Sequence, residues 1–360
     1  MSGSPTPRRR ATLASLAAEL KVSRTTISNA YNRPDQLSPE LRERVLAAAK
    51  RLGYPGPDPV ARSLRTRKAG AVGLLITEPL TYSFRDPAAL DFVAGLAQSC
   101  EELGQGLMLV AVGPSRTVAE GSASVLAAGV DGFVVYSLSE DDPYLEVALR
   151  RRLPVVVVDQ PKDVAGASRV GIDDRAAMCE LTEHVLALGH REIGLLTMRL
   201  RPDGRNGPVD AQRLRSATFQ VQSDRVNGVR DAMAAAGIAP ESLTVVESCE
   251  HTAASGGIAA RVAMEANPRI TALMCTADVL ALSAMDYLRG RGIFVPGQIS
   301  VTGFDGIPEA ISRGLTTVAQ PSLRKGRRAG ELLNSARIGS PVVEMLDTEL
   351  IRGRTAGPPG

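Results

Sequence analysis

Three polar side chains near the start of the chain have the types and spacing of groups that recognise base pairs: Arg24, Thr25 and Asn29. An arginine can donate two hydrogen bonds to O6 and N7 of guanine, and an asparagine can pair with N6 and N7 of adenine. The nearby Thr26 and Asn32 suit phosphate oxygens, which position a protein on DNA. The alternative is that all five are ordinary solvated residues. The chemistry that this group offers is hydrogen bonding to double-stranded DNA.

Two short helices must hold these side chains on one face. Apolar residues recur at helical spacing over 13–20 and predict a first helix. Ser23 is a suitable N-cap for a second helix, which turns Ile27 and Ala30 inward. Ser38-Pro39-Glu40 carries the start signals of a third helix. Two helices joined by a tight turn are typical of a helix-turn-helix, although a plain amphipathic hairpin has the same apolar pattern.

From residue 70 onward, short buried strands alternate with amphipathic helices. This rhythm predicts parallel sheets with helices on both faces, and its repetition around a change near 161–167 predicts two lobes. The predicted strands are Val72–Thr77, Leu107–Val112, Gly132–Tyr136, Val155–Asp159, Ile193–Thr197, Leu243–Glu247, Ala272–Thr276 and Ile299–Phe304. The predicted helices include Ala88–Leu103, Arg175–Leu188, Ser223–Ala236, Ala254–Ala266 and Val279–Arg289.

Ligands of open α/β folds bind at the carboxyl ends of the parallel strands. The side chains expected there are Tyr82, Phe84, Asp159, Asp173, Arg225, Phe304 and Asp305. Aromatic residues after the first strand can stack on a ring, and charged residues can hold hydroxyls or ring nitrogens. For each charged residue the alternative is a structural ion pair or a helix cap. Asp278 is interpreted mainly as an N-cap, and the polar stretch 201–219 as a loop able to cover or reshape the cleft.

Charge is distributed unevenly along the chain. Residues 1–70 contain 14 Lys and Arg and 5 Asp and Glu, a net charge of +9, so the remaining residues carry −6 of the total +3. A basic N-terminal part on an acidic body is typical of a modular DNA-binding protein. Composition alone also fits a soluble enzyme with a basic tail. Residues 1–11, rich in Pro, Ser and Arg, are expected to form a disordered basic arm.

Composition and motifs argue against several other classes of protein. No apolar run approaches the ~18 residues of a membrane span, and the N-terminal arginines lack the apolar segment of a secretory signal. The four cysteines lie far apart, which favours free thiols in a cytoplasmic protein. Aromatic content of 3% argues against stacking platforms for single strands. Because no dinucleotide, P-loop, metalloprotease or hydrolase motif is present, we expect no enzyme, cofactor or metal site.

A short segment links the two regions. Pro55-Gly56-Pro57-Asp58-Pro59 cannot lie inside a helix. The residues that follow, 60–65, are long enough for about two helical turns, and such a helix is marginal in water by itself. A helix that forms only with DNA or with a partner copy has the property that a switchable hinge requires.

The first region resembles the DNA-binding headpiece of lactose-repressor-type transcription regulators. The resemblance is carried by Leu16-Ala17, Val22-Ser23-Arg24-Thr25-Thr26-Ile27-Ser28, Asn32, Leu41-Arg42-Glu43-Arg44-Val45, Leu52-Gly53-Tyr54 and Ala61-Arg62-Ser63-Leu64-Arg65. Beyond residue 70 it is carried by Leu188-Gly189-His190-Arg191-Glu192-Ile193-Gly194, Arg225-Val226-Asn227-Gly228, Val295-Pro296, Ile299-Ser300-Val301-Thr302-Gly303-Phe304-Asp305, Leu315-Thr316-Thr317-Val318 and Gln320-Pro321. It implies an all-α helix-turn-helix headpiece joined to an α/β sensor of two doubly wound parallel-sheet lobes, similar to periplasmic binding proteins.

The resemblance also implies a function. It indicates a cytoplasmic, homodimeric regulator, a repressor, that binds a near-palindromic operator and responds to a sugar or a nucleoside- or purine-like compound between its lobes. It makes Arg225 and Asp305 the favoured effector partners, and Leu64 a wedge for the minor groove. It extends the expected DNA contacts to Thr12, Ser23, Arg24, Thr25, Thr26, Ser28, Asn29, Asn32, Ala61 and Leu64. Two departures are Ala277, where the family often has Asn, and a linker one residue longer that carries Asp58.

The expected organisation is a headpiece over 12–57, a hinge over 58–69, a core over 70–352 and a disordered tail over 353–360. Within the core we expect an N-lobe from about 70–161 plus 296–320, and a C-lobe from about 162–295 plus 321–352. The chain then crosses between the lobes near residues 160, 295 and 320. A transport binding protein or an α/β enzyme are alternatives, and both leave residues 12–65 unexplained.

Overall fold

The computed structural model describes residues 11–57, 63, 66–78, 84–113, 116–250, 252, 254–335 and 340–360. The chain divides into two compact units, one up to Ala69 and one from Gly70 to Gly360. The division falls at the end of the predicted hinge. The prediction of a hinge helix lies outside the described residues, as does that of a disordered arm, apart from residue 11.

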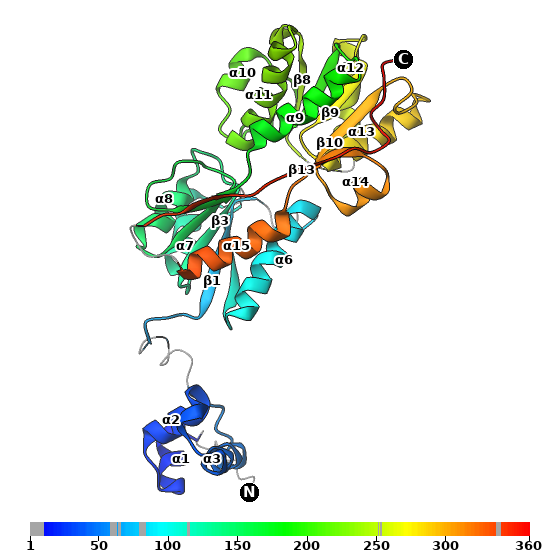
Figure 1. Ribbon diagram of the computed structural model, residues 1–360. Helices are drawn as coiled ribbons and strands as arrows, with labels where there is room; N and C mark the ends of the chain where they lie inside the picture. The colour runs from blue at the N-terminus through cyan, green and yellow to red at the C-terminus, as the bar shows by residue number, and fades with distance from the viewer. Residues whose placement is uncertain are drawn as a thin grey trace, which may run out of the picture. The chain divides into compact units, whose positions relative to one another are not determined.

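The first unit is the predicted three-helix headpiece (Figure 1). Its elements are α1 (Leu13–Leu20), α2 (Arg24–Asn32), a 3-10 turn (Pro34–Gln36) and α3 (Pro39–Leu52). Each of the three α-helices starts after a hydroxyl that accepts a backbone N–H bond, and these N-caps are Thr12, Ser23 and Ser38. The third helix ends at Gly53, whose φ of +67° is a conformation that glycine adopts without steric cost.

The apolar faces of the three helices share one small core. Leu16, Ile27 and Val45 are fully buried at its centre. Tyr31 and Tyr54 meet edge to face at its margin, with ring centroids 6.1 Å apart. Because helices this short are unstable alone, this shared core is what holds α2 in place.

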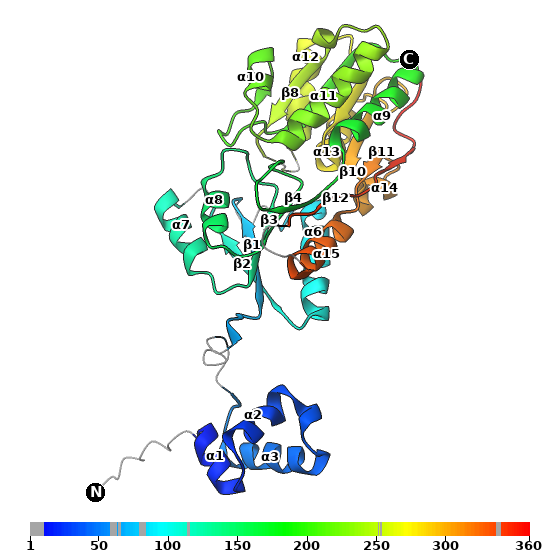
Figure 2. The same cartoon turned by 60° about the vertical axis from the view of Figure 1, so that its left-hand side comes forward.

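The second unit contains two sheets (Figures 1 and 2). One is formed by β1 (Ala71–Ile76), β2 (Gly106–Ala111), β3 (Gly132–Tyr136), β4 (Val155–Val158), β5 (Ser168–Gly171) and β12 (Val343–Met345). The other is formed by β6 (Ile193–Met198), β7 (Gly207–Pro208), β8 (Thr244–Ser248), β9 (Ala272–Cys275), β10 (Ser300–Asp305), β11 (Thr316–Ala319) and β13 (Glu349–Ile351). Their strand orders are β12-β5-β4-β3-β1-β2 and β13-β11-β10-β9-β6-β8-β7. All neighbours pair in parallel except the edge strands β7 and β13.

Helices accompany each sheet, which confirms the predicted fold class. The first sheet and its helices form the N-lobe, with α6 (Pro87–Glu102), α7 (Val118–Ala127), α8 (Pro143–Arg150) and α15 (Ser322–Ser335). The C-lobe has α9 (Asp174–Ala187), α10 (Ala211–Arg215), α11 (Gln220–Ala235), a 3-10 turn (Pro240–Ser242), α12 (Ser255–Ala266), α13 (Asp278–Gly290) and α14 (Pro308–Ser312). Among the described residues no helix is both long and apolar enough to span a membrane.

The predicted division into lobes is wrong over its later part. Strands β10 and β11, assigned to the N-lobe by the prediction, belong to the C-lobe: β10 pairs with β9 through Thr302↔Met274, and β11 pairs with β10 through Thr302↔Thr316. Helix α15 and strand β12, assigned to the C-lobe, belong to the N-lobe, as does β5. Which strands pair depends on contacts between separate segments, and the hydrophobic period of one segment does not encode it. The pattern of strands therefore does not predict the lobe to which each strand belongs.

The last residues, predicted as a disordered tail, pack against the C-lobe instead. The N–H of Val301 donates to the Thr355 carbonyl at 2.8 Å, and the Thr355 hydroxyl donates back to the Val301 carbonyl at 2.6 Å. The N–H of Thr316 donates to the same hydroxyl at 3.0 Å. The segment is ordered because it completes backbone hydrogen bonds at the starts of β10 and β11, which would otherwise be buried without partners.

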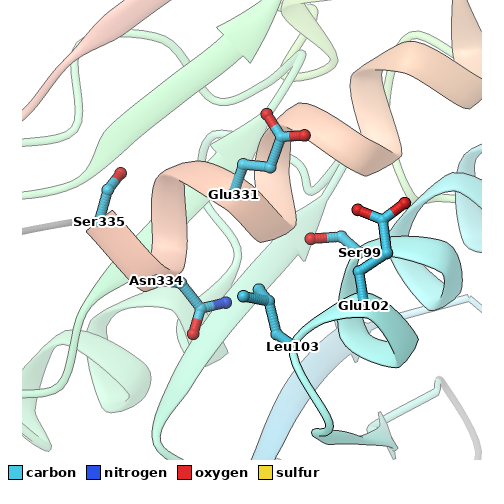
Figure 3. A pocket seen from close by; sticks show the side chains of 6 residues that line it. All are labelled: Ser99, Glu102, Leu103, Glu331, Asn334 and Ser335. Atoms are coloured by element: carbon cyan, nitrogen blue, oxygen red, sulfur yellow. The ribbon is translucent and has the colours of Figure 1, made fainter.

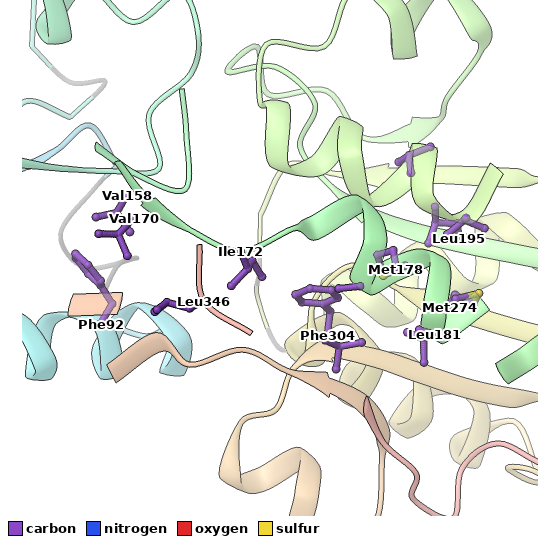
Figure 4. Close-up of a cluster of buried hydrophobic side chains, with 14 of the residues drawn as sticks. Phe92, Val158, Val170, Ile172, Met178, Leu181, Leu195, Met274, Phe304 and Leu346 are labelled. Carbon is purple, nitrogen blue, oxygen red and sulfur yellow. The ribbon is translucent and has the colours of Figure 1, made fainter. Parts of the chain in front are cut away.

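One apolar core runs through both lobes (Figure 4). Val158 and Phe92 lie on its N-lobe side, and Met178 and Leu195 on its C-lobe side. Ile172, in the segment that crosses from β5 to α9, lies between them. The crossings are therefore near residues 172, 320 and 347, so the one predicted near 295 is wrong and the one predicted near 160 lies later in the chain.

Candidate functional site

The second helix of the headpiece presents a polar face. Ile27 and Ala30 are buried against the headpiece core, whereas Arg24 and Thr25 are exposed at the start of the helix. The N-terminal end of a helix also favours phosphate oxygens, because its first N–H groups have no intrahelical partner. Thr12 and Ser23 are exposed as well, but their hydroxyls cap helices, whereas Arg24 and Thr25 have no capping role.

The other polar residues of α2 have partners inside the headpiece. The Ser23 hydroxyl lies 2.9 Å from that of Thr26 and accepts the N–H of the same residue. Asn29 donates to the Gln36 side chain at 3.1 Å, and Asn32 donates to the Ser28 carbonyl and hydroxyl at 3.0 and 3.1 Å. These side chains shape and cap the helix in the free chain, so base contact by Asn29 requires it to exchange its partner.

Several expected site residues contribute less directly or fall outside the described residues. The Thr12 hydroxyl caps α1 by accepting the N–H of Ser15. Ala61, Leu64 and Tyr82 are not among the described residues. Phe84 is described and is exposed.

In the core, the expected effector residues Arg225, Phe304 and Asp305 lie together where the lobes meet. The Arg225 guanidinium donates to Asp174 at 2.8 Å and to the Thr276 carbonyl at 2.6 Å. It lies 3.6 Å from the Asp305 carboxylate and stacks 3.6 Å from the centroid of the Phe304 ring. Together these contacts stabilise the buried positive charge of Arg225.

A chain of hydrogen bonds continues from Asp305 into the N-lobe. The Gln320 amide donates to Asp305 at 2.6 Å, and the Lys325 ammonium donates to the Gln320 side-chain oxygen at 2.5 Å. Lys325 also donates to Asp159 at 2.6 Å, and only 2% of the residue is exposed. Side chains of the two lobes are therefore joined directly, through Asp159 on one side and Asp305 on the other.

Carboxylates outnumber cations in this region. We define the interlobe cluster as Asp86, Tyr136, Asp159, Asp174, Arg225, Asp278, Asp305, Gln320 and Lys325. Five of its members are carboxyl groups and two are cations. Burial raises the pKa of Asp86, Asp174 and Asp305 despite the neighbouring Arg225, and it raises the pKa of Asp278 to about 6. Burial also raises the pKa of the Tyr136 hydroxyl, and Asp86, Asp159 and Asp305 add to this effect.

Asp173 has the alternative role considered for it, a helix cap, and the interpretation of Asp278 as an N-cap is wrong. Asp173 is exposed and caps α9 by accepting the N–H of Ala176, whereas its neighbour Asp174 is buried and pairs with Arg225. Asp278 is not an N-cap, since that position is Ala277. Its carboxylate instead accepts the Thr317 hydroxyl at 2.6 Å and the N–H of Ile307 at 2.9 Å.

Lys325 was missed because helix α15 was not among the predicted elements, whereas Gln320 was named only as part of the family resemblance and not as a site residue. The signal of Lys325 in the sequence is weak, since a lysine in an amphipathic helix is usually solvated. Asp174 was missed because two adjacent aspartates stand at the start of α9 and the first of them was chosen. The buried one can be recognised only in the tertiary structure, by its contact with Arg225.

The stretch 201–219, predicted as a loop, contains the short strand β7 and the short helix α10, and it contacts both lobes. Within it, Arg213 is buried and donates to Glu247 at 2.7 and 2.8 Å and to Asp203 at 2.8 Å. Arg213 holds the pKa of Asp203 down to about 2. At its end, Thr218 accepts the N–H of Glu140 at 2.9 Å and bonds the Ser139 hydroxyl at 2.7 Å. The stretch is thus anchored in the C-lobe and touches the N-lobe beside the interlobe cluster.

Comparisons with known proteins agree with this architecture. Residues 182–356 match the family model of a periplasmic binding protein-like domain. The chain is 76% identical to an HTH-type transcriptional regulator of Mycobacterium tuberculosis (strain ATCC 25618 / H37Rv), over 99% of each chain.

Solved structures are similar over nearly the whole length. A LacI-family transcriptional regulator from Corynebacterium glutamicum is 37% identical, with a TM-score of 0.74 over 97% of this chain and 99% of that one. The regulator CelR in complex with cellobiose is 27% identical, with a TM-score of 0.68 over 96% and 100%. The lac repressor dimer bound to operator and an anti-inducer has a TM-score of 0.75 at 23% identity, over 97% and 100%, a likeness of fold.

Proposed function

Because this chain belongs to the LacI family of transcription regulators, we propose that it represses transcription as a cytoplasmic homodimer bound to a near-palindromic operator. A small molecule held between the two lobes of each core controls that binding. Two-fold symmetry of the dimer matches two half-sites of the operator, each read by one headpiece.

The observation that carries the DNA role is the polar face of α2. Arg24 and Thr25 are exposed at the start of a helix whose opposite face is fixed by Ile27. An exposed side chain that is held on a rigid helix, and that need not exchange an existing hydrogen bond, is suited to hydrogen bonding with base edges. The net charge of +9 over residues 1–70 adds attraction to phosphates.

The interlobe cluster suggests the chemical class of the effector. Its two cations, Arg225 and Lys325, are already paired with Asp174 and Asp159, so an added phosphate would find no free positive charge in the cluster. Hydroxyl groups, in contrast, can donate to carboxylates and accept from Arg225 and Lys325 at the same time. We infer an uncharged polyhydroxylated effector, such as a sugar or a cyclic polyol, rather than a sugar phosphate.

The same cluster suggests how an effector acts. Gln320 and Lys325 join Asp159 of the N-lobe to Asp305 of the C-lobe. An effector that takes over some of these bonds changes the preferred relative position of the lobes, because it binds one arrangement better than the other. We propose that this change decides whether the hinge over 58–69, with Ala61 and Leu64, folds on the operator.

The experiment is selection of bound sequences from random duplex DNA, followed by a screen for compounds that change the affinity for the selected sequence. We expect a near-palindrome, and we expect a neutral polyol or sugar to change the affinity. Each sugar is paired with its phosphate ester as a matched control. A selected pool without sequence preference would contradict the DNA role, and a response to the phosphate ester alone would contradict the effector class.

A further inference from the structure

A cavity of about 390 Å³ lies in the C-lobe, where the stretch 201–219 meets α11. Figures 1 and 2 show α10, the helix of that stretch, beside α11. The lining residues are Ala211, Leu214, Arg215 and Ala217 from the stretch, and Ser223, Asn227 and Arg230 from α11. Since a water molecule occupies about 30 Å³ of liquid volume, the cavity is large enough for a small organic molecule.

One face of α11 supplies the polar wall of the cavity. Ser223, Asn227 and Arg230 follow one another at helical spacing, so they lie on the same side of the helix. Another face is packed tightly on α9, since a Cβ atom at Gly228 would lie 2.3 Å from the Arg175 carbonyl oxygen. This packing fixes the helix, and with it the positions from which the three polar side chains extend.

Both cations of the lining are available to a ligand. Arg215 is exposed, and its guanidinium has no hydrogen bond or ion pair with any residue that the structure describes. Arg230 reaches only Glu241, at 3.4 Å, and the Glu241 side chain is 76% exposed. An ion pair so long and so exposed contributes little to stability. Arg230 can therefore exchange this contact for a ligand at little cost.

No carboxylate is among the described residues that line the cavity, and those that follow or precede the lining in the sequence already have partners. Asp210 accepts a backbone N–H at 2.6 Å. Asp224 pairs with Lys162. Asp231 accepts two bonds from Arg175, at 2.5 and 2.9 Å. The charge of the lining is therefore positive and uncompensated.

A cavity in the N-lobe shows the opposite situation (Figure 3). It lies between the C-terminal ends of α6 and α15, and its charged lining residues are Glu102 and Glu331. Both carboxylates accept a bond from Arg327 at 3.0 Å. A ligand there would have to displace existing ion pairs. The C-lobe cavity instead offers one cation without such a pair and one whose pair is long and exposed.

We propose that the C-lobe cavity binds the phosphate group of a small organic phosphate. Arg215 and Arg230 donate to its oxygens and match its charge, which is about −1.5 to −2 at pH 7. The Ser223 hydroxyl and the Asn227 amide add two neutral donors, because the bond between them, at 3.4 Å, is longer than an ordinary hydrogen bond. The organic part of the ligand lies against Leu214. A carboxylate is a poorer fit, since it has fewer oxygens and a single charge.

The cavity adjoins two contacts between the lobes. The residue after Ala217 is Thr218, whose hydroxyl bonds that of Ser139 in the N-lobe at 2.7 Å. At the other wall, Lys162 of the N-lobe pairs with Asp224. A phosphate that joins the two walls orders both segments that carry these contacts. It therefore biases the relative position of the lobes from outside the interlobe cluster.

The test is calorimetric titration of the full-length chain with glycerol 3-phosphate at constant ionic strength, with glycerol as the uncharged control. We expect one saturable site for the phosphate, weaker binding of glycerate and no binding of glycerol. Arg215→Gln and Arg230→Gln should each weaken binding about tenfold, the loss of one hydrogen bond to a charged group. Ser223→Asp should abolish it, because it places a carboxylate in the cavity. Arg291→Gln, the same charge change at an exposed arginine of the C-lobe outside the cavity, should leave binding unchanged.

Thermal melts separate binding from folding. Arg215→Gln should leave the melting temperature of the free chain unchanged, because the exposed side chain supports no buried contact. Ser223→Asp should also fold, since a carboxylate in the first turn of a helix is stabilising.

The proposal is overturned if glycerol 3-phosphate does not bind, or if glycerol or glycerate binds as tightly. It is also overturned if the three cavity variants bind the phosphate as tightly as the unaltered chain, or if Arg291→Gln weakens binding as much as they do. A phosphate ester held by the headpiece or at the interlobe cluster would bind equally to Arg215→Gln and the unaltered chain. Failure of this proposal is therefore distinguishable from failure of the proposed function.

Discussion

The headpiece and the interlobe cluster use charge in opposite ways. In the headpiece, Arg24 is exposed on a small apolar core, and its charge is available to a ligand at little cost. In the interlobe cluster, Arg225 and Lys325 are buried. Their hydrogen bonds to Asp174, the Thr276 carbonyl, Asp159 and Gln320 are already formed in the free chain. The first site works by adding contacts and the second by exchanging them.

This difference predicts different consequences of mutation. Removing an exposed charge should lose only the proposed contact with DNA, because the exposed side chain supports no buried contact. Removing a buried charge leaves its partners desolvated and unpaired, which costs stability as well as binding. The predictions below use this contrast, from the largest expected effect to the smallest.

Arg225→Ala should destabilise the core by about 3–5 kcal/mol, because it leaves Asp174 and Asp305 buried beside no guanidinium. Hydrogen exchange followed by mass spectrometry can report the two units separately, and we expect faster exchange in α9 and α11 with no change in α1–α3. The response to the effector should also be lost. Asp305→Asn is the matched variant and should cost less, since Asp174 still pairs with Arg225. If Arg225→Ala is as stable as the unaltered chain, the proposed contrast between the headpiece and the interlobe cluster is wrong.

Leu16→Ala should cost the headpiece about 2–5 kcal/mol, because it leaves a cavity in a core of few residues. That loss is comparable to the whole stability of a small domain. We expect specific DNA binding to disappear while the melt of the core is unchanged. Leu75→Ala, an equally buried leucine of β1, is the control and should lower the melt of the core without unfolding it. Retained operator binding by Leu16→Ala would mean that the headpiece has other support.

Arg24→Ala should weaken operator binding by about 1–3 kcal/mol and relax the choice of base at one position in each half-site. The free chain should melt as before, because the side chain is exposed and supports no buried contact. Selection from random DNA with the variant measures the change in preference. If affinity falls equally for all sequences, Arg24 holds a phosphate instead of a base.

The two units should also differ in their dependence on pH. Burial raises the pKa of Asp278 from its ordinary 3.8 to about 6, so the folded core binds a proton between these values that the unfolded chain does not. Stability from this group is present at low pH and is lost as the pH rises through 6. Between pH 7 and 5 this group alone should add about 1 kcal/mol to the stability of the core, and Asp278→Asn should remove that part of the pH dependence. The headpiece should show no such gain, and a parallel rise in both units would contradict this account.

Much of the fold could be predicted from local patterns. The N-caps Thr12, Ser23 and Ser38 and the apolar spacing of the headpiece determine its three helices within one or two residues. The eight predicted strands of the core all exist within about the same margin. Short strands such as β5 and β12 were missed because their hydrophobic pattern is brief, and helix α15 was missed because charged residues are so frequent in its sequence.

For the candidate sites the outcome follows the same division. Arg24 and Thr25 are exposed as expected, since one helix and one cap suffice to place them. Asp159 and Asp305 lie in the cluster as expected, because the carboxyl ends of parallel strands meet at one edge. Arg225 also lies in the cluster, with Phe304 stacked against it. Asp173 does not, and Lys325 was not foreseen.

What the sequence determined by itself is local: where helices begin and end, which faces are apolar, and that the N-terminal part is basic. These features depend on residues within a few positions of one another, where backbone sterics and hydrogen bonds decide the outcome. Only the tertiary structure decided which lobe receives β10, β11 and α15, which of Asp173 and Asp174 is buried, and that Thr355 belongs to the C-lobe. Those outcomes depend on pairings between segments that are not adjacent in the chain, such as Asp174 with Arg225 and Val301 with Thr355. There the competing arrangements have the same local pattern and differ only in what they bury together.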